Sequence, residues 1–125
     1  MNLATQSLSP ELLVEIVDRY GARPDITPGG PWRFPLHQCI ATALPERKNG
    51  GHEEIKIEII DLGLRGLGFK TNAPVAEGDL LTIFLKVPGL PPQNWPCRIV
   101  DVHSFDGYWY QAGARFEKAG SSHDA

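Results

Sequence analysis

The sequence predicts an all-β domain, a six-stranded antiparallel barrel with one amphipathic helix before it. Short segments rich in β-branched and aromatic residues recur over residues 36–117, and turns rich in Gly, Pro, Asn and Asp separate them. Apolar residues at helical spacing occur near the N-terminus. The length of 125 residues fits a single domain, residues 1–125, with one hydrophobic core.

The predicted helix spans residues 10–20. Ser9 is a suitable N-cap, and Pro10 suits the first helical position because an N–H there has no helical partner. Gly21 can end the helix. The tail after residue 117 is short and rich in Gly and Ser, which makes it a poor helix. We therefore expect the N-terminal helix to cover the barrel, or to pack on a second copy in a homodimer, by burying Leu12, Leu13 and Ile16.

Residues 22–32 are predicted to be a loop, because three prolines and two adjacent glycines prevent a long regular element. The clearest strand contains Ile55, Ile57 and Ile59, which alternate with polar residues. An Asp-Gly turn joins the last two strands. Closing the strands into a barrel removes the exposed edges of a small sheet. The predicted strands are residues 37–44, 54–61, 67–71, 80–87, 97–103 and 108–117.

Charge and composition exclude several classes of function. The formal net charge of −3 argues against general nucleic-acid binding, which depends on Lys and Arg neutralising phosphates. No apolar run approaches the roughly 20 residues that span a bilayer. The start of the chain lacks the basic and apolar blocks of a signal peptide. We therefore expect a cytoplasmic protein with no membrane partner.

The sequence offers no pattern typical of a metal site or an enzyme. Cys39 and Cys97 form no C-x-x-C pair, and the four histidines are scattered along the chain. Two reduced, unreactive thiols are the simplest interpretation of the cysteines. No serine has the context of a catalytic nucleophile. We expect no metal, no cofactor and no catalytic activity.

The most informative stretch is residues 61–69, DLGLRGLGF, which connects two predicted strands. Its glycines do not form a dinucleotide-binding motif, because their spacing is wrong and no helix follows. Glycine is favoured where the backbone adopts a positive φ or where two backbones approach closely. These glycines therefore indicate a tight corner between strands.

This stretch resembles the D/N-x-S-x-x-G motif of the PilZ family, with Asp61, Gly63 and Gly66 at the matching positions. Residues 33–36, Arg-Phe-Pro-Leu, resemble the second arginine of the family's R-x-x-x-R motif and the residues after it. Residues 111–116 resemble the closing G-x-x-F strand. The resemblance covers about residues 31–117 and implies a PilZ-type barrel.

PilZ domains are receptors for cyclic di-GMP, so the resemblance implies a ligand site formed by Arg33, Asp61, Gly63 and Gly66. An arginine fork can bind the O6/N7 edge of guanine or a phosphate in bidentate fashion. A carboxylate beside a glycine-rich turn can accept hydrogen bonds from guanine N–H groups.

The sequence departs from the family motifs at two positions. Gly29 stands where the first arginine of R-x-x-x-R is expected, and Gly63 replaces the motif serine. The loss of one charge-assisted partner costs about 1.5–3 kcal/mol, or about one to two decades in affinity. Arg23 or Arg65 could substitute, although their spacing is not that of the family.

Two functions therefore stay open. One is a cyclic di-GMP receptor or adaptor in bacterial second-messenger signalling. The other is a PilZ-like domain that has lost the nucleotide and acts as a protein–protein interaction module, for example with motility or pilus machinery. We expect a protein partner.

Overall fold

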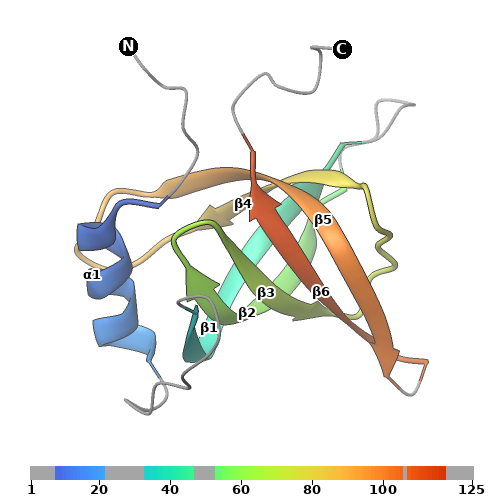
Figure 1. Ribbon diagram of the computed structural model, residues 1–125, viewed down its shortest axis with the longest axis horizontal. Coiled ribbons are helices and arrows are strands. Elements are labelled where there is room, and N and C mark those ends of the chain that lie inside the picture. The colour runs from blue at the N-terminus through green and yellow to red at the C-terminus, as the bar shows by residue number, and fades with distance from the viewer. Residues whose placement is uncertain (1–7, 22–32, 47–52, 106, 118–125) are drawn as a thin grey trace.

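The computed structural model describes residues 8–21, 33–46, 53–105 and 107–117. One helix, α1 (Pro10–Tyr20), precedes six strands. The strands close into an antiparallel barrel in the order β1-β2-β3-β6-β5-β4, which confirms the predicted fold class (Figure 1). Their bounds are β1 (Arg33–Pro45), β2 (Ile55–Gly63), β3 (Gly66–Thr71), β4 (Leu80–Leu85), β5 (Gln93–Phe105) and β6 (Trp109–Phe116).

Three strands begin earlier than the sequence predicts, β3 by a single residue and β1 and β5 by more. β1 includes Arg33, so the barrel extends beyond the predicted start at residue 36, and β5 begins at Gln93 within a predicted turn. Pro96 lies in β5, where its carbonyl oxygen accepts a hydrogen bond from the N–H of Glu117 at 2.8 Å. A residue's N–H and C=O point to the same side of a strand. The nitrogen of Pro96, which carries no hydrogen, therefore points toward the end of β6. Few hydrogen bonds between β5 and β6 are lost there.

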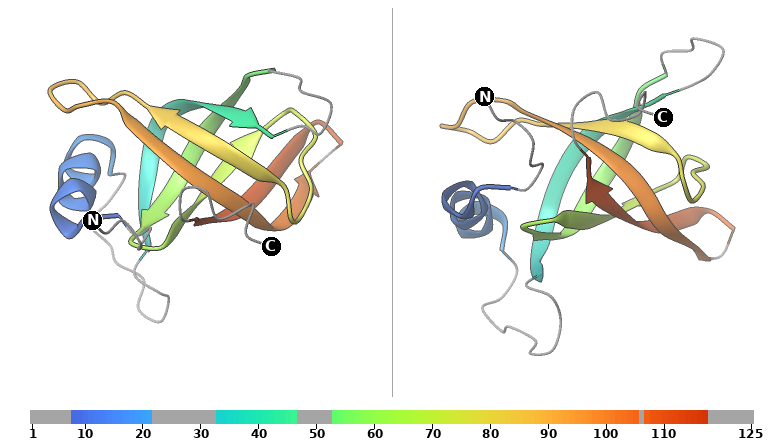
Figure 2. Two further views of the ribbon diagram at one scale, coloured as in Figure 1. Left: turned by 90° about the horizontal axis from the view of Figure 1, so that it is seen from above. Right: turned by 45° about the horizontal axis from the view of Figure 1, so that its top comes forward.

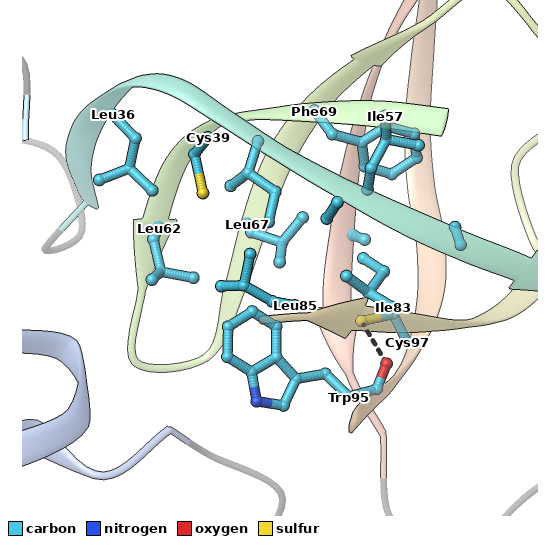
Figure 3. Packing of buried hydrophobic residues seen from close by; sticks show 14 of the residues in the cluster. Leu36, Cys39, Ile57, Leu62, Leu67, Phe69, Ile83, Leu85, Trp95 and Cys97 are labelled. Carbon is cyan, nitrogen blue, oxygen red and sulfur yellow. Dashed lines mark hydrogen bonds between the residues drawn. The ribbon is translucent and has the colours of Figure 1, made fainter. Parts of the chain in front are cut away.

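Inward-facing apolar side chains fill the barrel. In β2 the predicted alternation is observed, since Ile55, Ile57 and Ile59 are buried. Figure 3 shows Ile57 beside Phe69 of β3, with side chains from β1, β4 and β5 in the same cluster. Trp95 is also buried, and its ring lies 5.5 Å from the ring of Phe116, measured between centroids. The interior is therefore a packed core.

The helix α1 lies beside the barrel, next to β1 (Figure 2). The side chain of Ser9 accepts a hydrogen bond from the N–H of Leu12 at 3.2 Å, as expected of an N-cap. Leu13 and Ile16 are buried in the barrel's core cluster, and Leu12 packs against it. The helix thus covers its own barrel, the first of the two predicted arrangements. Among the described residues, no helix has the length and apolar character needed to cross a membrane.

Gly21 ends α1 as predicted, but for a different reason from the one that usually favours glycine there. Its φ of −62° is extended rather than left-handed. A Cβ at this position would meet the carbonyl oxygen of Val17, to which the N–H of Gly21 donates a hydrogen bond at 2.7 Å. Close contact therefore requires glycine here.

Both cysteines are free and buried in the core. Burial raises the pKa of Cys39 and that of Cys97 from 9.0 to about 12, and the charges of Glu58 and Glu117, respectively, add to the effect. The Cys97 thiol also contacts the carbonyl oxygen of Trp95 at 3.4 Å (Figure 3). Because the thiolate is the reactive form, both thiols are expected to be unreactive in the folded protein.

The contribution of α1 can be measured with two substitutions in the same helix. Ile16 is fully buried, whereas Val14 is 63% exposed. We expect Ile16→Ala to lower the free energy of unfolding by about 2–5 kcal/mol, because it leaves a cavity in the core. The control Val14→Ala should change it by less than about 0.5 kcal/mol. Urea denaturation measures both, and equal midpoints would show that α1 does not pack on the barrel.

Alkylation tests the burial of the cysteines. At about pH 8, iodoacetamide should modify Cys39 and Cys97 much more slowly in the native protein than in protein unfolded by urea. Because the raised pKa values mean that the unfolded chain loses these protons first, stability should fall as the pH rises from 9.0 towards about 12. Intact-mass spectrometry measures the modification. Rapid alkylation of either thiol under native conditions would contradict the packed core.

Candidate functional site

The strands β1 and β2 bring the two predicted motifs together. In their antiparallel register Arg33 lies opposite Gly63, and Pro35 lies opposite Asp61. Side chains opposite each other in such a pair project to the same face of the sheet. The backbone therefore places positions 33, 61 and 63 next to one another.

The alternation of side chains shows which face this is. Leu62 is buried in the barrel core, and its partner in register, Phe34, packs against the same core. Neighbouring residues in a strand point to opposite faces. Positions 33, 61 and 63 therefore lie on the outer face, while positions 34 and 62 face inward.

The carboxylate of Asp61 lies over a glycine of the neighbouring strand. A Cβ added to Gly68 would lie 3.0 Å from Oδ2 of Asp61. Gly68 pairs in turn with Gly113 of β6, at which a Cβ would lie 2.9 Å from Oδ1 of Asp101. The N–H of Gly113 donates a hydrogen bond to that oxygen at 3.1 Å. The outer face thus has a strip of two glycines with a carboxylate on either side.

Gly66 has a structural role in this corner. It lies opposite Arg115 in the pairing of β3 with β6, and an added Cβ would overlap the carbonyl oxygen of Ala114. The preceding turn is fixed by two backbone hydrogen bonds, from the N–H of Phe116 to the carbonyl of Arg65 at 2.9 Å and from the N–H of Leu8 to the carbonyl of Leu64 at 2.8 Å. Close backbone packing therefore accounts for glycine at position 66.

Two exposed arginines lie near the same corner. Arg65 is in the turn between β2 and β3, and Arg115 lies in β6 opposite Gly66. A third, Arg98, lies opposite Arg115 and forms an ion pair with Glu117 at 3.1 Å. The corner therefore combines cationic groups with the carboxylate of Asp61, a set that suits a ligand with both phosphates and N–H donors.

Sequence reasoning missed Asp101 and Arg115. The stretch of residues 111–116 was singled out, but only the strand register places Gly113 beside Asp101. That register shifts between Ile99 and Asp101, so counting along the sequence could not reveal the contact. Gly29 and Arg23 lie outside the described residues.

Trp109 is exposed on the outside of the barrel, where the ammonium group of Lys70 lies 6.0 Å from the centre of its ring. No group of three or more His, Cys, Asp or Glu side chains in the described part of the chain is arranged to hold a metal ion.

A family model for the PilZ domain matches residues 32–124, which include all six strands. The chain belongs to the PilZ family. The match begins after α1, so the helix is an addition that precedes the matched region of this PilZ domain. A search of curated proteins gives no match.

Two alanine substitutions distinguish the role of Gly66, which packs against the backbone of β6, from that of Gly68, which lies beneath the carboxylate of Asp61. Gly66→Ala should lower the free energy of unfolding by about 1–3 kcal/mol, because its Cβ would meet rigid backbone. Gly68→Ala should cost less, because its Cβ would meet a carboxylate that can rotate away. Chemical denaturation compares them in the same strand. A larger loss for Gly68→Ala would contradict the close packing at Gly66.

Proposed function

We propose that this PilZ domain is a cyclic di-GMP receptor that binds its ligand on the outer face of β1, β2, β3 and β6. Family membership gives the broader class, a signalling domain of the cyclic di-GMP-binding type. The observation that supports the proposal is the register that sets Arg33 opposite Gly63 and Pro35 opposite Asp61. This register unites the two motif parts that the sequence retains.

Each part of the proposed site has a distinct task. Arg33 would bind the guanine edge or a phosphate, and Asp61 would accept hydrogen bonds from guanine N–H groups. Gly63 would allow the ligand to approach the backbone of the corner closely, and Gly66 would hold that corner against β6. Arg65 and Arg115, exposed near Gly66, would supply positive charge in place of the missing first arginine.

Ligand binding would be transmitted to α1 through the same strands. Phe34 and Leu64 are next to motif positions in the sequence. Together with α1 they line an apolar groove of about 380 Å³. Leu8, just before the helix, donates a backbone hydrogen bond to Leu64, and Gly21 after it forms a β-bridge with Leu36. A shift of the corner on the outer face would therefore move the surface on which α1 packs. This coupling would suit an adaptor that reports the ligand to a protein partner.

The alternative is an interaction module without nucleotide binding. Glycine at positions 29 and 63 favours it, because a guanidinium group and a hydroxyl are both missing from the family motifs. Gly66 does not distinguish the two functions, since the packing of the barrel requires it in either case.

Titration with cyclic di-GMP distinguishes these functions. If the ligand binds the native state, a concentration of 100 times Kd should stabilise it by about 2.7 kcal/mol and raise the melting temperature. Arg33→Ala should abolish the rise, and Gly29→Arg should enlarge it by restoring the missing first arginine of the motif. If phosphate contacts dominate, binding should weaken at high salt. Calorimetry and thermal melting measure these effects.

The control variant is Arg19→Ala, since Arg19 lies on α1 and pairs with Glu15 at 2.7 Å. It should leave the ligand-induced shift unchanged. The absence of a shift at millimolar ligand, both in the natural sequence and in Gly29→Arg, would refute the receptor and favour the interaction module.

A further inference from the structure

A second surface lies on another part of the barrel, over β1, β4 and β5. Two large apolar side chains are exposed there, Ile40 at 54% and Phe84 at 36%. Thr42 of β1 lies opposite Phe84 of β4 and also opposite Lys56 of β2, while Phe84 lies opposite Asn94 of β5. Lys56, Thr42, Phe84 and Asn94 therefore form one row across the four neighbouring strands β2, β1, β4 and β5.

The surface is hollowed because the strands differ in length. β1 pairs with β4 only over the stretch from Thr42 to Pro45, and β4 ends at Leu85. Ile40 lies on β1 outside this stretch. Among the described residues it therefore has a partner in β2 but none in β4. The result is an open groove of about 460 Å³ with an apolar floor formed mainly by Ile40, Phe84 and Pro92.

The charge of this groove is opposite to that of the whole chain. Its two charged lining residues are Lys56 and Lys86, which are both exposed and come from different sides of the floor. The nearest acidic residue in register is Glu58, which lies opposite Ile40 on one side and opposite Lys70 on the other. The formal net charge of the chain is −3. The groove is therefore a local basic site with an apolar centre.

We propose that this groove binds a short acidic segment of a protein partner that carries an apolar or aromatic side chain. The apolar side chain would pack on Ile40 and Phe84, which removes apolar surface of both partners from water. Flanking carboxylates would pair with Lys56 and Lys86, and the amides of Gln93 and Asn94 would bond the backbone of the segment.

The observations favour a peptide over the other anionic partners. A nucleic acid or a lipid surface presents negative charge over a large area, and the net negative charge of the chain would oppose it. Two lysines around a floor of this size instead suit a short segment with few charges. The groove shares β1 and β2 with the Asp61 corner but is lined by other residues of these strands, so the proposal does not depend on nucleotide binding.

Selection from a phage-displayed library of linear peptides tests this proposal. The full chain serves as the target, and the double variant Lys56→Glu/Lys86→Glu serves for counter-selection. We expect enrichment of sequences with several Asp or Glu residues around an apolar or aromatic residue. The most enriched sequence, synthesised with a fluorescent label, is then titrated by anisotropy.

The titration should show dependence on both charge and apolar contact. Ile40→Ser and the double lysine variant should each weaken binding by about tenfold or more, and added salt should also weaken it. Two matched controls lie elsewhere on the barrel. Lys70→Glu reverses a lysine of β3, and Val100→Ser removes an apolar side chain of β5 that is 43% exposed. Both should bind the peptide like the natural sequence.

Three outcomes would overturn the proposal. The first is a selection that enriches no acidic, apolar sequences over the double variant. The second is equal weakening by the control variants, which would indicate non-specific charge effects. The third is lysine-dependent binding of phosphatidylserine vesicles or oligo-dT without peptide binding, which would assign the groove to another class of partner. The substituted side chains are exposed, except for that of Lys70, which is half-buried, so circular dichroism and melting should confirm that every variant folds.

Discussion

The pairing register of β1 with β2 is the constraint on which the candidate site depends. A slip of one residue would turn every side chain of a strand to the opposite face. Asp61 would then enter the core, and Leu62 would face outward. The three isoleucines of β2 and Leu62 are buried in the observed register. A slip would expose these apolar side chains to water, and the free-energy cost of that exposure opposes it. The hydrophobic core thus determines which residues the outer surface presents.

The sequence predicts most of the fold, because the relevant signals are local. Capping by Ser9 and the alternation in β2 each depend on a few adjacent residues. The early start of β5 could not be predicted, because Pro96 is tolerated only where β6 ends. The contact of Asp101 with Gly113 depends on a register shift between two strands. The retained motif residues could be found in the sequence, but their neighbours across the barrel required the structure.

The glycines of the corner illustrate why a motif can be kept for more than one reason. Gly66 faces backbone atoms of β6, whereas Gly68 and Gly113 face the carboxylates of Asp61 and Asp101. The first contact is a condition for closing the barrel, and the other two shape its outer surface. A glycine-rich motif at this corner is therefore weak support for ligand binding, and residues 33 and 61 are the informative ones.

A packed barrel leaves its outside for binding, and here β1 contributes to both proposed surfaces. Arg33 stands at its start and Ile40 in its middle. Between them the pairing register shifts, and Gln38 has a φ of 57°, in the left-handed region. Such a conformation costs about 1–3 kcal/mol at a non-glycine residue, so the surrounding structure must stabilise it. A bulge bends its strand and increases the local twist, and after this one β1 pairs with β2 and, from Thr42 onward, also with β4. The irregularity therefore separates the Asp61 corner from the lysine-lined groove along a single strand.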